Sequence, residues 1–161
     1  MSRIAASTIA GLVAGVVFGL MMQMMTAPTP DGGRVPMMTM VAGVVRSDSL
    51  LVGWLYHLFN SALIGAIFGG VLGSRVEDYG SGLLWGGLYG VAWWVLGGLI
   101  LMPALLGMPL FAPMMMAPMR PVAWGSFIGH VLYGLILGSV FVWLGKTAAA
   151  QPAGSSSRPA S

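Results

Sequence analysis

Two histidines are the side chains in this sequence best suited to chemistry. His57 and His130 each lie within a long apolar segment, where an ionisable side chain usually has a functional role. At helical spacing, His57 shares a face with Asn60 and Ser61. His130 shares a face with Tyr133 in the same way. Both imidazoles are therefore expected to point into a bundle of helices.

The histidine pair allows two interpretations. In the first, each imidazole hydrogen-bonds a neighbouring hydroxyl, amide or carbonyl and joins one helix to another. In the second, His57 and His130 ligate a haem iron from opposite sides, and glycine leaves room for the macrocycle. We favour the first, because the sequence gives no sign of the gap that haem requires. The cofactor therefore stays unassigned.

Methionine is the second candidate, with 14 residues in the chain. Met21 with Met25, and Met115 with Met119, would form pairs on one helical face, and thioethers select Cu(I). Alternatively, methionine serves as a flexible apolar filler in segments broken by proline. We favour the filler interpretation, because a copper site would more convincingly mix methionine with histidine or cysteine.

Several other kinds of chemistry lack support in the sequence. The chain has no cysteine, which excludes disulfides and thiolate sites. No phosphate-binding loop, dinucleotide fingerprint or metalloprotease motif is present. The basic residues are scattered singly, so a nucleic-acid partner is not expected. An enzyme is the least supported class.

The elements that position these residues are four long apolar segments. Hydrophobic residues make up 57% of the chain and charged residues 7%. A segment of roughly 20 apolar residues is long enough to cross a bilayer. The sequence therefore predicts an all-α polytopic membrane protein, a bundle of four transmembrane helices in one domain over residues 1–146, followed by a disordered tail over 147–161. The predicted helices cover residues 4–25, 50–72, 82–102 and 122–144.

The second half of the chain resembles the first. Gly11 aligns with Gly86, and His57 aligns with His130. This predicts two helix-hairpin repeats, which are parallel because each holds an even number of spans. Small residues four apart would let the helices approach closely. The predicted packing positions are Gly11, Gly15, Gly65, Gly69, Gly86, Gly90, Gly134 and Gly138.

Charge near the helix ends favours one orientation. The side that carries both termini would hold Arg3, Arg75, Lys146 and Arg158, against Arg34, Arg46 and Arg120 on the other. Because basic residues favour the cytoplasmic side, we expect a multi-pass protein of the cell (inner or plasma) membrane with cytoplasmic termini.

Residues 125–138 read GSFIGHVLYGLILG. Together with the glycine-rich first helix and the proline-ended hairpin, this segment resembles an uncharacterised family of small four-helix prokaryotic membrane proteins, over about residues 4–145. The resemblance implies a fold and a membrane location, and it brings no activity.

The leading hypothesis is a non-enzymatic accessory or structural component of the lipid bilayer, with His57 and His130 joining the two repeats. Its partners would be lipid and either further copies of itself or a larger membrane complex. The alternatives are a bis-histidine haem protein and a Cu(I)-handling protein.

Overall fold

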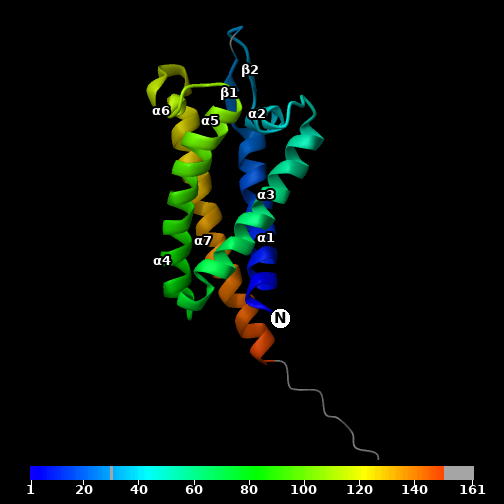
Figure 1. Cartoon of the computed structure of the whole chain (residues 1–161), viewed down its shortest axis with the longest axis vertical. Helices are drawn as coiled ribbons and strands as arrows, with labels where there is room; N and C mark the ends of the chain where they lie inside the picture. The colour runs from blue at the N-terminus through cyan, green and yellow to red at the C-terminus, as the bar shows by residue number, and fades with distance from the viewer. Residues whose placement is uncertain (30, 151–161) are drawn as a thin grey trace, which may run out of the picture.

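Four long helices dominate the structure (Figure 1). The computed structural model describes residues 1–29 and 31–150, with side chains through Thr147. The all-α class is confirmed, and four helices are long and apolar enough to cross a membrane. They are α1 (Arg3–Met24), α3 (Leu50–Val71), α4 (Tyr79–Trp93) with its continuations η2 (Trp94–Leu101) and α5 (Met102–Leu105), and α7 (Arg120–Ala150).

The predicted ends of the first two helices agree closely with α1 and α3, whereas the other two helices are longer than predicted. Helix α7 continues to Ala150, so the predicted tail begins inside a helix. Residues 151–161 of that tail lie outside the described residues. The fourth helix is extended by an alanine-rich segment, and alanine is the strongest helix former.

Helix α4 starts earlier than predicted because Asp78 and Ser81 form a capping box. The Asp78 carboxylate accepts a hydrogen bond from the Ser81 amide at 2.7 Å, and the Ser81 hydroxyl accepts one from the Asp78 amide at 3.0 Å. The hydrogen bonds from the Ser81 amide and hydroxyl hold the pKa of Asp78 below its usual value.

Helix α1 packs against α3 and α7, and α7 also packs against α4. The α1–α3 and α4–α7 contacts are the closest. A Cβ built at Gly65 would lie 2.9 Å from the Cα of Gly11, and one built at Gly86 would overlap the Gly134 carbonyl oxygen. The structure places all eight predicted packing glycines at these two contacts.

Short elements close the end of the bundle opposite the N-terminus (Figure 1). They are the paired strands β1 (Thr26–Pro28) and β2 (Arg34–Pro36), the helices α2 (Met37–Val44) and α6 (Ala112–Met115), and the 3-10 turn η3 (Ala117–Met119). The 3-10 turn η1 (Gly73–Arg75) lies between α3 and α4 at the other end. The sequence analysis predicted none of these short elements, since such pieces depend on the helices beneath them.

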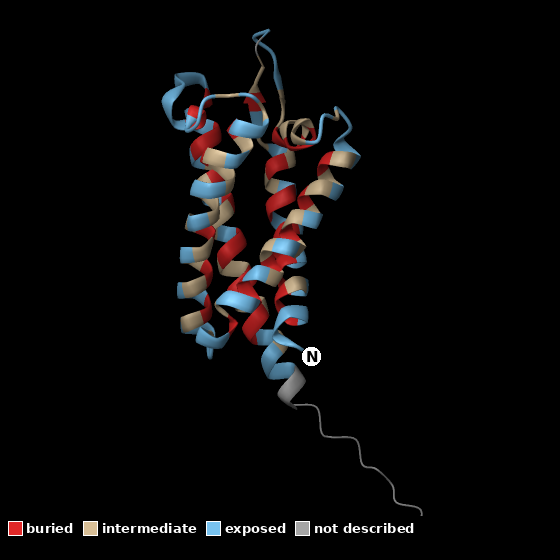
Figure 2. Cartoon of the chain, in the orientation of Figure 1, coloured by how far each residue is buried: buried red, intermediate tan, exposed pale blue. Residues whose placement is uncertain are grey.

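Most of the large apolar side chains of α3 are exposed, and Figure 2 shows buried and exposed residues alternating along its ribbon. Leu51 is 68% exposed and Phe59 is 65% exposed, whereas Ser61 is 3% exposed and Gly65 is buried. The inward face of this helix therefore carries small and polar residues together with the fully buried Phe68, and the outward face is large and apolar.

The α4–α7 contact gives a first testable prediction. Gly86→Ala should destabilise the protein by about 1–3 kcal/mol, because the added methyl meets backbone that cannot move aside cheaply. Gly87→Ala is the matched control, since its Cβ would lie 3.4 Å from the flexible end of Leu135. Thermal unfolding in detergent, followed by circular dichroism, measures both variants. Equal stability of the two variants would show that backbone contact does not limit this interface.

Candidate functional site

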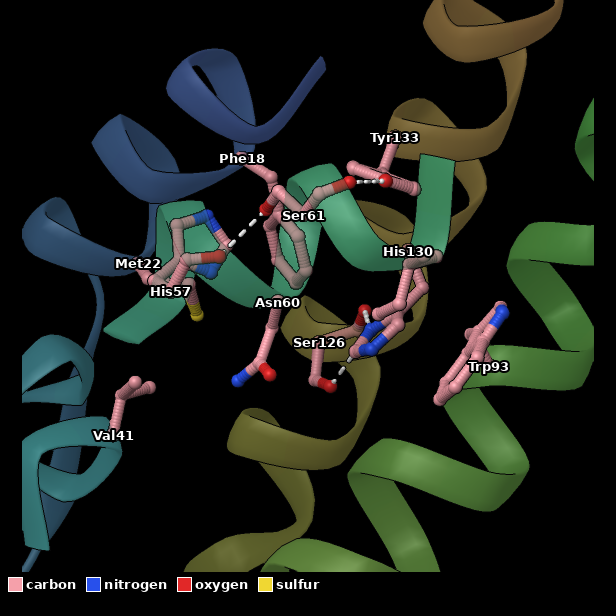
Figure 3. Close-up of a pocket in the computed structure, with 11 residues that line it drawn as sticks. Phe18, Met22, Val41, His57, Asn60, Ser61, Trp93, Ser126, His130 and Tyr133 are labelled. Carbon is pink, nitrogen blue, oxygen red and sulfur yellow. Dashed lines mark hydrogen bonds between the residues drawn. The ribbon is translucent and has the colours of Figure 1, made fainter. Parts of the chain in front are cut away.

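Both histidines line one cavity of about 140 Å³ in the middle of the bundle (Figure 3). We call it the central cavity. Its walls come from α1, α2, α3, α4 and α7. The polar side chains among its lining residues are His57, Asn60, Ser61, Ser126, His130 and Tyr133. The structure thus brings the two predicted site residues to one place.

His57 joins α3 to α1. Its Nε2 lies 2.8 Å from the carbonyl oxygen of Gly15. Because a carbonyl only accepts, Nε2 carries the proton and donates it. In the neutral ring, Nδ1 is then the acceptor. His57 therefore joins two helices, which is the role that the sequence favoured. The helices that it joins are α1 and α3, so the bond lies within the first predicted repeat.

His130 is held differently. Its Nδ1 lies 2.8 Å from the carbonyl oxygen of Ser126, one turn earlier on the same helix. By the same reasoning Nδ1 donates, and Nε2 of the neutral ring is an acceptor. A Cβ built at Gly97 would lie 3.9 Å from this Nε2, and one built at Gly98 would lie 3.6 Å from the ring's Cε1. Both glycines therefore lie beside the imidazole.

Phe18 of α1 contacts both imidazoles. Its ring centroid lies 5.7 Å from that of His57 and 4.8 Å from that of His130, edge-on in each case. Figure 3 shows the phenyl ring between the two histidines. A bis-histidine haem site does not fit this arrangement, because Phe18 stands between the rings and Nε2 of His57 donates to Gly15.

Two tyrosines, rather than the histidines, hydrogen-bond the α4–α7 pair of helices to the α1–α3 pair. The Tyr133 hydroxyl on α7 donates to the Ser61 carbonyl on α3 at 2.7 Å. The Tyr89 hydroxyl on α4 donates to the Ile64 carbonyl at 2.8 Å. Helical spacing predicted the face on which Tyr133 lies, but not its hydrogen bond to another helix. The hydrogen bond of Tyr89 was not predicted either, since a backbone acceptor on another helix leaves no pattern in the sequence.

A second cavity of about 280 Å³ adjoins the first. We call it the wedge cavity, and it lies between α3 on one side and α4, η2 and α5 on the other. Asn60, Ile64, Trp93 and His130 line both cavities. Helices α3 and α4 approach each other near η1 and diverge toward the other end (Figure 1). The wedge cavity fills the space that this divergence leaves.

Helix η2, along this cavity, is a π-helix of eight residues. Its wider turn is uncommon, and such segments often occur at functional sites. Gly97 of this segment lines the wedge cavity, and Trp94 donates from its indole nitrogen to the Ala123 carbonyl at 3.2 Å. No pattern in the sequence predicted the π-helix.

The methionine pairs do not lie on continuous helices. Helix α1 ends at Met24, and Met25 has an extended backbone. Met115 ends α6 and is exposed, whereas Met119 lies in η3 and is buried. The helical geometry assumed for a copper site at Met21, Met25, Met115 and Met119 is therefore absent. Within residues 1–29 and 31–147, no three histidine, cysteine, aspartate or glutamate side chains cluster as metal ligands.

Comparisons with known protein families, curated proteins and solved structures found no match to this chain. The resemblance to small four-helix membrane proteins stays a prediction.

The tyrosine hydrogen bonds give a second prediction. Tyr133→Phe should lower the free energy of unfolding by about 0.5–1.5 kcal/mol, because it removes one buried hydrogen bond and little else. Tyr79→Phe, at an exposed position near η1, is the control and should leave stability unchanged. Unfolding in detergent by increasing denaturant compares the two. A Tyr133→Phe variant as stable as the original protein would show that this hydroxyl does not help to join the helix pairs.

Proposed function

We propose that this chain is an integral membrane protein whose four long helices cross the bilayer. The outward face of α3 supports this, with Leu51, Leu55 and Phe59 each more than half exposed. In water, such a continuous apolar surface would be strongly unfavourable. In lipid it is favourable, and the small residues then face the neighbouring helix.

We further propose that the bundle consists of two parallel hairpin repeats. Equivalent contacts support this. Gly11 faces the Ser61 carbonyl between α1 and α3, and Gly86 faces the Gly134 carbonyl between α4 and α7. Gly11 and Gly86 are matched by the internal sequence alignment, and Ser61 and Gly134 each lie four residues after an aligned histidine.

The orientation we propose places the N-terminus, the loop with η1 and the end of α7 on the cytoplasmic side of the cell membrane. These three segments lie at the same end of the bundle (Figure 1). Arg3, Arg75 and Lys146 belong to this end, and basic residues favour the cytoplasm. Arg158, which the sequence analysis also counted there, lies outside the described residues.

The role that we propose is that of a non-enzymatic accessory or structural membrane component, acting with lipid and with further copies or a larger complex. The observation that supports this proposal is that interior polar groups hydrogen-bond one helix to another. His57, Tyr133 and Tyr89 each donate to a backbone carbonyl of another helix. Such bonds stabilise the arrangement of helices.

Reporter fusions test the topology. A reporter active only outside the cytoplasm should be active when inserted in the turn at residues 31–33 or in the loop at 106–110. It should be inactive in the loop at 75–78. A cytoplasmic reporter should give the opposite pattern. The same activity at all three positions would contradict four membrane crossings.

Spectroscopy and metal analysis test the non-enzymatic role against the two cofactor alternatives. After mixing with haem or Cu(I) and removal of the unbound cofactor, the purified protein should show no Soret band and no stoichiometric copper dependent on its own residues. A Soret band lost in both His57→Ala and His130→Ala would support haem binding instead. Copper lost on replacing Met21, Met25, Met115 and Met119 would support copper handling.

A further inference from the structure

We propose that the wedge cavity binds a quinol: an uncharged, membrane-soluble molecule with a planar hydroxylated ring and an apolar tail. This inference rests on the proposed membrane location. It is carried by three features of the cavity, which are its opening, its polar groups and its aromatic wall.

The opening faces outward along the bundle, between α3 and the continuation of α4. Leu63 and Leu105 line the cavity and are 49% and 48% exposed. In a membrane, these residues would lie at the boundary with lipid. A ligand would therefore enter sideways from the bilayer, which requires it to be soluble in lipid.

The polar groups of the cavity carry no formal charge if the histidine is neutral. Among residues 1–29 and 31–147, no arginine, lysine, aspartate or glutamate lines either cavity. A phospholipid headgroup would bring a charge to this depth without a partner, at a high cost. An uncharged polar head avoids that cost.

His130 selects for a hydroxyl. The Nδ1–H group donates a hydrogen bond to the Ser126 carbonyl, so Nε2 of the neutral ring is the acceptor. A ligand hydroxyl can donate to this nitrogen, whereas a quinone carbonyl cannot. Asn60 lines the same cavity and offers an amide that both donates and accepts. A quinol therefore matches these groups better than its oxidised form.

The ring of Trp93 supplies an aromatic wall. Trp93 lines both cavities, as do Asn60 and His130. Aromatic rings pack favourably in offset or edge-on contacts. The apolar side chains of Leu63, Leu101 and Leu105 would then lie beside the tail.

Calorimetric titration in detergent under anaerobic conditions tests the proposal, with decylubiquinol, decylubiquinone and 1-decanol as probes. Decylubiquinol should bind saturably and more tightly than the other two. Asn60→Leu and His130→Phe should each weaken its binding by about tenfold, the weight of one buried hydrogen bond. Leu55→Ala, on the outward face of α3, is the control and should bind normally.

A further variant covers the case in which His130→Phe fails to fold. Gly97→Leu would place a side chain in the wedge cavity without removing a hydrogen-bonding side chain, and it should abolish binding. The proposal is overturned if no probe binds saturably, if decanol binds as tightly as the quinol, or if the quinone binds more tightly. If the reporter fusions support four crossings but no quinol binds, only the quinol proposal is rejected. If the fusions do not support four crossings, the membrane arrangement itself is rejected.

Discussion

Direct contact between helix backbones is the constraint on which the rest of this structure depends. At Gly11 with Gly65, and at Gly86 with Gly134, one backbone lies against another with no room for a Cβ. Apolar side chains gain little from meeting each other in a hydrocarbon solvent, so close contact over small residues is a main source of helix association there. Many of the large apolar side chains then cover the outside.

This constraint also explains where the cavities lie. The close contacts join α1 to α3 and α4 to α7, and α1 and α7 bring the two pairs together. Helices α3 and α4 are linked by a short loop, and the Tyr89 hydroxyl of α4 donates to the carbonyl of Ile64 on α3, a residue that lines the wedge cavity. Away from the loop they diverge, and the wedge cavity occupies the gap. Cavity and close packing are thus two results of the same arrangement.

The interior polar groups fall into two sets with different consequences. His57 and Tyr133 donate to backbone carbonyls of other helices, which restrains the bundle. Asn60 and His130 instead line the wedge cavity, where a ligand would find hydrogen-bonding partners. The two histidines match in sequence, yet only His57 joins helices, because the acceptor of His130 is on its own helix.

The sequence by itself determined the four long apolar helices and the inward-facing glycines, because both follow from composition and from helical spacing along one chain. It also predicted that His57 and His130 would point into the bundle. Only the tertiary structure decided which groups they bond, that Phe18 lies between them, and that Tyr89 and Tyr133 connect the helix pairs. The π-helix at Trp94–Leu101 and the break between Met115 and Met119 were likewise decided there. These features depend on backbone groups and on the tilt of helices far apart in the chain, and neither is recorded in the spacing of side chains.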